Sequence, residues 1–249
     1  MTDPSPQPLV EQALTAYFWS GDALRSRSVS EVVLAGVVEI PAPPARLVCD
    51  WDRDAQDLGL EPGDVEPLQL ARTRARWPDY QQCVQAMADW TRGLGLEDLL
   101  QTVTTNGDVA LMVCRGARYH NDASQYGSAA FCNLFLSEDK NLDLHFPATG
   151  HRLPLMRGMA VVFDTGQAHA VVRRGSNGFD AADFATGQDC SQFFLTWELP
   201  IEDVPVARAL QISFDTNPAI APQLSEEQVR LGAERVTVDP DSGGWCRHG

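Results

Sequence analysis

The chain of 249 residues is long enough for one domain with a sizeable core, and it carries a net charge of −15 with a pI near 4.6. A surface this acidic repels a bare phosphate backbone, so we expect no nucleic-acid partner. Residues 1–8 contain neither the basic nor the apolar segment of a secretory signal, and no run of 18 apolar residues occurs. We therefore expect a cytoplasmic protein without a membrane partner.

The N-terminal part of the chain mixes helical and strand patterns. Residues 9–19 have helical character, whereas residues 31–40 and 46–51 resemble strands. Apolar side chains then recur at helical spacing and predict a helix packed on a sheet: Tyr80, Cys83, Val84, Met87, Trp90 and Leu94. These elements are expected to wrap a core that lies further along the chain.

The middle of the chain consists of short apolar runs separated by Gly, Pro, Asp and Asn. The runs cover residues 109–114, 130–136, 142–146, 159–163 and 192–197. Short strands separated by turn residues are typical of an antiparallel sandwich or barrel. The sequence therefore predicts a mainly β fold with flanking helices.

Two histidines and an aspartate in this region suit a metal site. His120 and Asp122 are two residues apart, so on a strand both side chains point to the same face, and His169 follows on a later strand. Two histidines and one carboxylate form a facial triad for iron(II). Three coordination positions stay open in such a triad, which is enough for a chelating organic co-substrate and dioxygen.

The dyad of His120 and Asp122 is weak evidence when taken alone. With five histidines and 22 aspartates, chance places an aspartate two residues after some histidine in roughly 40% of such chains. His145 and His151 are alternative ligands if the triad is misassigned. The position of the triad among the predicted strands is what favours His120, Asp122 and His169.

Residues 107–200 resemble the 2-oxoglutarate and iron(II)-dependent oxygenase superfamily. The likeness rests on the order of His120-Asn-Asp122, the run 133–139, and Arg157-Gly-Met-Ala-Val-Val-Phe-Asp leading to His169. It implies a double-stranded β-helix, which is a cupin-like jelly roll of eight strands. It also implies that His120, Asp122 and His169 bind Fe(II), and that 2-oxoglutarate chelates the iron before O2 binds.

The resemblance further implies a reaction class. 2-Oxoglutarate would be converted to succinate and carbon dioxide while an unactivated C–H bond of a small molecule, such as an amino acid or a natural-product intermediate, is hydroxylated. Related halogenases have a small residue at the position of Asp122. The carboxylate therefore favours hydroxylation, desaturation or ring closure.

One departure from the family concerns the distal carboxylate of 2-oxoglutarate. Members often bind it with an Arg or Lys ten or more residues after the second histidine, but residues 175–189 contain neither, and the next strand offers only Gln192. Strand parity suggests Arg173 first and Arg118 second as replacements. Tyr126 is expected to contact co-substrate or substrate. Residues 174–189 are long enough to form a lid over the iron.

We expect a single catalytic domain over residues 1–249. Residues 1–106 would wrap the core, residues 107–200 would form the jelly roll with the iron site, and residues 201–249 would add a strand, a short helix and a tail. The capping-box pattern of residues 225–228 predicts that helix, and residues 239–249 lack periodicity. The six cysteines show no zinc spacing and are expected to be reduced.

Two further interpretations stay open. A cupin-type metal-dependent dioxygenase or isomerase would keep the barrel and the metal without using 2-oxoglutarate, and the missing basic residue favours it. A jelly-roll binding module would use His120 and His169 structurally and would bind no iron. The sequence indicates no oligomeric state.

Overall fold

The core of the molecule is a roll of eight antiparallel strands. The computed structural model describes residues 13–96, 109–185 and 187–247. The core strands are β5 (Val109–Cys114), β6 (Ala117–His120), β7 (Ala129–Phe135), β8 (Leu142–Phe146), β9 (His151–Pro154), β10 (Met159–Asp164), β11 (His169–Arg173) and β12 (Gln192–Pro200). They pair as nested partners: β5 with β12, β6 with β11, β7 with β10, and β8 with β9. This nesting is the topology of a jelly roll, so the predicted mainly β fold is confirmed.

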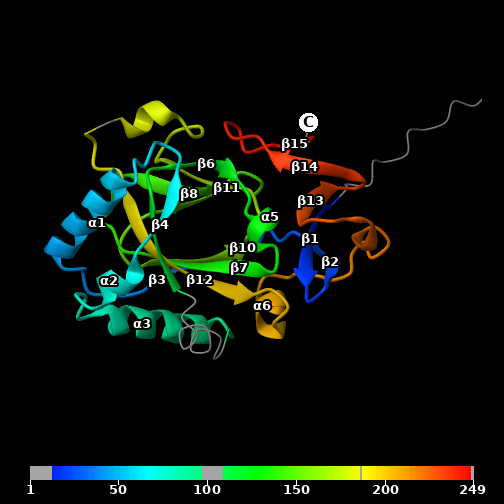
Figure 1. The fold of residues 1–249 in the computed structure, drawn as a ribbon, viewed down its shortest axis with the longest axis horizontal. Coiled ribbons are helices and arrows are strands. Elements are labelled where there is room, and N and C mark those ends of the chain that lie inside the picture. The colour runs from blue at the N-terminus through cyan, green and yellow to red at the C-terminus, as the bar shows by residue number, and fades with distance from the viewer. Residues whose placement is uncertain (1–12, 97–108, 186, 248–249) are drawn as a thin grey trace, which may run out of the picture.

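The eight strands belong to two sheets (Figure 1). One has the order β3-β10-β7-β12-β5-β4, in which β3 (Val33–Val37) and β4 (Val65–Leu68) extend the edges, and the other has the order β6-β11-β8-β9. Side chains from both sheets meet in one apolar interior, which includes Phe135, Val161, Phe163, Leu144 and Val171. Because successive strand residues face opposite sides, the neighbours of these residues point outward.

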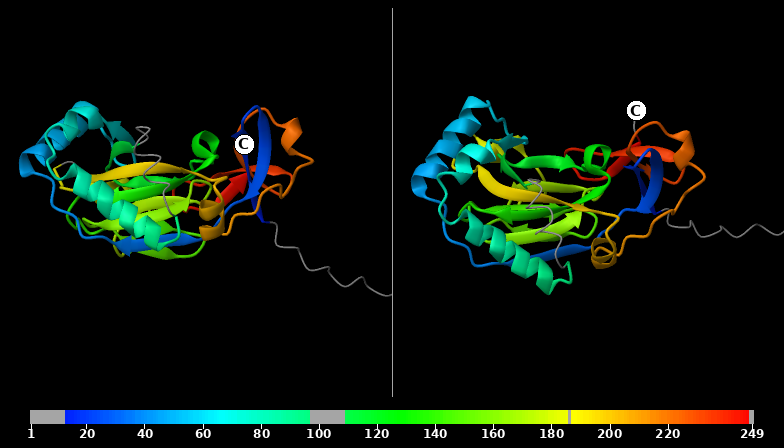
Figure 2. Two further views of the ribbon diagram at one scale, coloured as in Figure 1. Left: turned by 90° about the horizontal axis from the view of Figure 1, so that it is seen from below. Right: turned by 60° about the horizontal axis from the view of Figure 1, so that its bottom comes forward.

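Helices cover the outer face of the six-stranded sheet. α1 (Ala45–Asp57) and α3 (Tyr80–Gly93) bury Trp51 and Met87 against outward-facing strand residues such as Leu134 and Trp197. Figure 2 shows both helices on the outside of the core. The remaining short helices are α2 (Leu70–Arg74), α5 (Ala123–Tyr126), α6 (Val204–Ala209), η1 (Ala181–Phe184) and η2 (Ala221–Gln223). No described helix has the length and apolar character that crossing a membrane requires.

A third sheet joins the two ends of the chain beside the core (Figures 1 and 2). Its order is β15-β14-β13-β1-β2, with β1 (Leu14–Ser20), β2 (Ala23–Ser28), β13 (Gln228–Leu231), β14 (Glu234–Val238) and β15 (Trp245–Arg247). α5 lies against β1 and β13. The third sheet therefore supports the segment that follows His120.

The structure confirms the strand within 31–40, the helix over Tyr80–Gly93 and the five core runs. The predicted strand over 46–51 is wrong, because Leu47, Trp51 and Ala55 are buried at helical spacing within α1. The helix predicted for 9–19 is wrong from Leu14 onward, where β1 pairs with β2 and β13; residues 9–12 lie outside the described residues.

Two C-terminal predictions are also wrong. Residues 225–228 do not start a helix, because the Glu227 carboxylate accepts a hydrogen bond from the backbone N–H of Trp19 at 2.8 Å, and β13 begins at Gln228. The predicted tail is ordered through β15, which pairs with β14. In the first case a partner from the other end of the chain overrides the local pattern, and in the second the preceding strand supplies the partner.

Candidate metal centre

His120, Asp122 and His169 come together at one end of the roll. Each offers a ligand atom, and these atoms lie within 4.8 Å of one another. His120 ends β6 and His169 begins β11, where the two residues are direct register partners with ring centroids 4.4 Å apart. The Asp122 carboxylate oxygens lie 3.4 Å from His169 Nε2 and 3.7 Å from His120 Nε2. The three side chains thus converge on one point.

Backbone carbonyls orient both imidazole rings. His120 Nδ1 lies 2.7 Å from the carbonyl oxygen of Arg118, and His169 Nδ1 lies 3.0 Å from that of Gln167. A carbonyl only accepts, so each Nδ1 carries the proton and donates it. Nε2 then keeps its lone pair for a metal, which is the usual arrangement of a metal-binding histidine.

Asp122 lies just beyond the strand that carries His120. It precedes α5, and its backbone N–H donates to the Thr165 carbonyl at 2.8 Å. The Thr165 hydroxyl in turn lies 2.7 Å from the Tyr126 carbonyl and 2.8 Å from that of Ala129. The turn after β10 therefore positions Asp122 and leads directly into His169.

A buried ion pair supports this turn. Arg27 and Asp164 are both fully buried, and two guanidinium nitrogens of Arg27 each lie 2.7 Å from an Asp164 oxygen. Asp164 also accepts the backbone N–H groups of Ser30 and Gly166. The sequence analysis missed Arg27, Asp164 and Thr165, because a pair separated by 137 positions leaves no local pattern.

The surroundings keep His169 neutral. The pKa of His169 is lowered to about 4, mainly by burial and also by the nearby His120, against the opposing effects of Asp122 and the Gln167 carbonyl. A neutral imidazole does not have to lose a proton before it binds a metal. Burial also raises the pKa of the Tyr126 hydroxyl, as do Glu198 and Asp122, so this group stays protonated.

The triad lies in the wall of a cavity of about 380 Å³. Around the triad, polar side chains line it: Gln125, Tyr126, Asn133, Thr196 and Glu198. Its remaining wall is largely apolar and includes Met112, Cys114, Phe135, Leu144, Val171 and Phe194. The cavity can therefore hold an organic molecule of which one end is bound at the metal.

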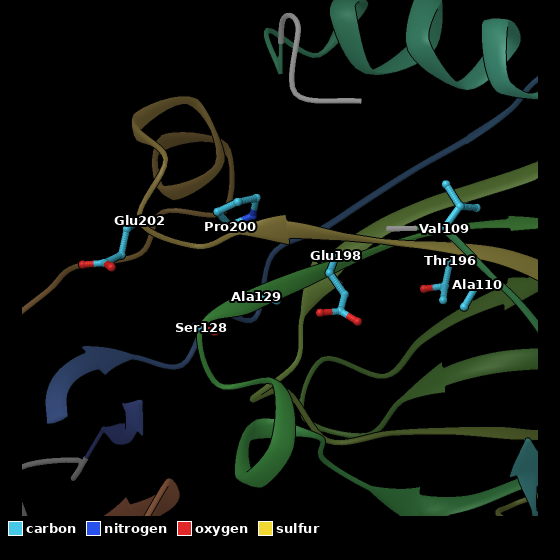
Figure 3. Close-up of a pocket in the computed structure, with 8 residues that line it drawn as sticks. All are labelled: Val109, Ala110, Ser128, Ala129, Thr196, Glu198, Pro200 and Glu202. Carbon is cyan, nitrogen blue, oxygen red and sulfur yellow. The ribbon is translucent and has the colours of Figure 1, made fainter. Parts of the chain in front are cut away.

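A second, more open cavity of about 510 Å³ adjoins the first. The two share Ala110, Thr196 and Glu198, while Ser128, Pro200 and Glu202 belong to the outer one (Figure 3). Thr196 and Glu198 project from the same side of β12 in Figure 3, as the alternation of a strand requires. Together the two cavities offer a path from the surface to the triad.

The two predicted co-substrate arginines lie outside the cavity around the triad, whereas Tyr126 lines it. Arg118 is exposed and lies over the Phe179 ring at 5.4 Å. The register changes between the pairs His120–His169 and Ala117–Val171, so β6 has one residue more than β11. This bulge breaks the parity on which the shared face of Arg118 was predicted.

Arg173 is held at the far end of β11 from His169. Its guanidinium donates to the Asp183 carbonyl and to the Gln188 side chain, each at 2.9 Å. Arg115 donates to the Ala185 carbonyl in the same segment. None of the described residues of 174–189 lines the cavity around the triad, so the position of this loop does not support the predicted lid.

The remaining histidines lie elsewhere. His145 Nδ1 is 2.6 Å from the Tyr119 hydroxyl, and burial lowers the pKa of His145. His151 is exposed at the start of β9. Among the described residues the group that could hold a metal is His120, Asp122 and His169.

Two solved structures are weakly similar to this chain. No family model matches the chain, and no curated protein matches it. A prolyl-4-hydroxylase from Pseudomonas putida is similar at 17% identity with a TM-score of 0.36, covering 68% of this chain and 92% of that one. A prolyl 4-hydroxylase from Phytophthora capsici is similar at 16% identity with a TM-score of 0.33, covering 71% of this chain and 56% of that one. Similarities this weak carry no argument about function, which must come from the residues of this chain.

Proposed function

We propose that this protein is an iron(II)-dependent oxygenase that uses a 2-oxo acid as co-substrate and hydroxylates a C–H bond of a small molecule. The convergence of His120, Asp122 and His169 within 4.8 Å in the wall of a cavity carries the proposal. Two imidazoles and one carboxylate leave three positions open on a six-coordinate ion. The iron would supply the site for O2 activation, with the 2-oxo acid as the source of electrons.

The donor set fits iron(II). Both histidines present Nε2, because each Nδ1 donates to a carbonyl, and Asp122 supplies the negative charge. The backbone N–H of Asp122 is bound to Thr165, which fixes the segment that carries the carboxylate. Within the cavity, Tyr126, Asn133 and Thr196 are neutral polar groups that can orient a ligand.

2-Oxoglutarate itself fits this cavity poorly. Its keto and C1 carboxylate oxygens need only the iron, but its distal carboxylate needs a donor, preferably a cation. The residues that line the iron cavity in the described parts of the chain include no Arg or Lys. Arg173 and Arg118, predicted for this role, have other partners.

The same observation favours one alternative function. A cupin-type dioxygenase or isomerase would bind iron through the same three residues and use no 2-oxo acid, so it would need no cation in the cavity. The binding-module interpretation predicts that no iron binds.

Oxygen consumption tests the proposal. The protein is loaded anaerobically with iron(II), mixed with 4-methyl-2-oxopentanoate or 2-oxoglutarate, and exposed to oxygen at an oxygen electrode. We expect consumption that depends on both iron and a 2-oxo acid, that is lost in Asp122→Ala, and that persists in His151→Ala as the matched control. Iron binding with no response to either acid would replace the proposal by the cupin-type function.

A further inference from the structure

The structure describes the position of every Lys and Arg of this chain. The sequence contains 19, and all of them lie in the described residues, because residues 1–12, 97–108, 186 and 248–249 contain none. None of the 19 lines the iron cavity. The residues outside the described ranges therefore cannot supply a Lys or Arg to the cavity.

The cations nearest the roll are bound elsewhere. Their partners are carbonyls, carboxylates or rings outside the cavity: Ala185 for Arg115, Phe179 for Arg118, Asp189 and Ser191 for Lys140, Ser176 for Arg152, Asp183 and Gln188 for Arg173, and Asp139 and Asp143 for Arg174. Moving one of them into the cavity would break these contacts.

The cavity already contains negative charge. Asp122 and Glu198 both line it, and the rest of its wall is mostly apolar. A carboxylate removed from water needs a counter-charge or several donors. The C1 carboxylate of a bound acid would have iron as its counter-charge. A second carboxylate further in would have none.

Gln192 lies on the inner face of β12 beyond Phe194. It shares that face with Phe194 and Thr196 by strand alternation, and its register partner on β5 is Cys114; of these, Phe194, Thr196 and Cys114 line the cavity. Gln192 is fully buried, and neither its amide nitrogen nor its amide oxygen has a hydrogen-bond partner. A buried carboxamide in this state can donate to and accept from a neutral polar group, but it cannot neutralise a carboxylate.

We propose that the cavity selects a 2-oxo acid with a single carboxylate and an uncharged tail over the dicarboxylate 2-oxoglutarate. The keto acid end lies at the iron, and the tail lies along Leu144, Val171 and Phe194 toward Gln192. This inference rests on the proposed function and names the co-substrate class of that site.

The reaction balances with dioxygen as the oxidant. The 2-oxo acid loses C1 as carbon dioxide and becomes the acid one carbon shorter. One atom of O2 enters the new carboxylate, and the other enters the alcohol formed from the substrate C–H bond. Two electrons come from the 2-oxo acid and two from that bond.

Anaerobic titration tests the selection directly. The wild-type protein with one equivalent of iron(II) is titrated with 4-methyl-2-oxopentanoate, 2-oxoglutarate or pyruvate, and the visible charge-transfer band of a chelated 2-oxo acid is recorded. Pyruvate measures chelation without a tail. We expect 4-methyl-2-oxopentanoate to half-saturate the band at a concentration at least tenfold lower than either of the others.

Each other outcome has a distinct meaning. If 2-oxoglutarate half-saturates at an equal or lower concentration, the inference is wrong and the proposed function stands. If iron binds but no acid gives the band, both the inference and the use of a 2-oxo acid are wrong. If iron does not bind, the proposed function itself is wrong, and the inference with it.

Substitution of Gln192 gives an independent test. Gln192 does not itself line the cavity but is the register partner of Cys114, which does, so Gln192→Arg places a cation beside the cavity wall. This variant is expected to lower the half-saturating concentration of 2-oxoglutarate at least tenfold relative to 4-methyl-2-oxopentanoate. Gln192→Met is the matched neutral control and should leave the preference for the uncharged tail in place. Iron stoichiometry and circular dichroism verify that each variant is folded. A folded Gln192→Arg protein with unchanged preference would contradict the assigned place of the tail.

Discussion

His120 and His169 lie directly opposite each other on β6 and β11, although 49 positions separate them in the sequence. Their rings are 4.4 Å apart at the centroids, and each Nδ1 is bound to the carbonyl two residues before it in the chain. Antiparallel pairing therefore brings the two candidate metal ligands together, and the local carbonyls set the tautomers of both rings. Asp122 needs only two more residues of chain to reach the same point.

The metal-free protein is predicted to lose stability in mild acid through His169. The pKa of His169 is lowered to about 4, so between pH 6.5 and that value the unfolded chain takes up a proton that the folded protein does not bind. Stability is thus present at neutral pH and falls as pH decreases. We expect His169 to account for about 1.5 kcal/mol of the loss between pH 6.5 and 5. Urea unfolding at both pH values measures the free energy of unfolding. Between pH 6.5 and 5 this free energy should fall less in His169→Gln than in wild type, and the difference should equal the contribution of His169.

The buried pair of Arg27 and Asp164 is predicted to hold the turn that supports the metal site. Arg27→Met leaves Asp164 charged and buried, so the free energy of unfolding should fall by about 3–5 kcal/mol. Arg25→Met is the matched control, because Arg25 is about one-third exposed and its ion pairs lie at the surface. Its loss should stay below about 1 kcal/mol. Similar losses in the two variants, measured by urea unfolding, would contradict the structural role of Arg27.

Gly158 is predicted to be irreplaceable at the start of β10. Its φ is +85°, and a Cβ atom there would lie 2.2 Å from the Val38 carbonyl oxygen. Gly150 has a φ of +70° with nothing within 4 Å of a Cβ, so Gly150→Ala carries the backbone strain without the clash. Gly158→Ala should be less stable than Gly150→Ala by at least about 1 kcal/mol. Equal unfolding temperatures of the two variants would contradict the prediction, because they would mean that the backbone at Val38 moves away from the new Cβ atom at no cost.

The cysteines are predicted to divide into two reactivity classes. Burial raises the pKa of Cys83 to about 11 and that of Cys114 to about 12, and it raises the pKa of Cys132 as well. Cys190 is buried too, whereas Cys49 and Cys246 are exposed. A thiol reagent at pH 8 should therefore label two cysteines in the native protein and six after unfolding. Mass spectrometry of the labelled peptides identifies them, and rapid native labelling of Cys132 would contradict the packed core.

The core strands could be predicted from the sequence, because their residues are either alternately apolar and polar or continuously apolar. These patterns reflect burial of one or both faces of each strand within the two core sheets. The convergence of His120, Asp122 and His169 also agrees with the sequence-based prediction, although Asp122 lies just beyond β6 and not on it. Arg118 could not be placed, because a bulge in β6 changes the parity that the prediction assumed. Bulges depend on the pairing partner, which a single strand does not reveal.

The third sheet shows a second limit of the sequence. β1 and β13 pair although more than 200 residues separate them. The Glu227 carboxylate accepts a hydrogen bond from the backbone N–H of Trp19, instead of capping the helix that the sequence predicted at residues 225–228. Such contacts have no signature within a local window. The same holds for the support of Asp122 by Thr165, which depends on a turn from another strand.

Iron binding tests the central claim most directly. Anaerobic equilibrium dialysis against iron(II), with the metal quantified by inductively coupled plasma mass spectrometry, compares wild type with His120→Ala, Asp122→Ala and His169→Ala; His151→Ala is the control. We expect one iron per chain in wild type and the control, and affinity reduced at least about 100-fold in each triad variant, since a lost ligand removes a coordinate bond. Wild-type protein without stoichiometric iron, or triad variants that bind as tightly as wild type, would contradict the assignment of this site.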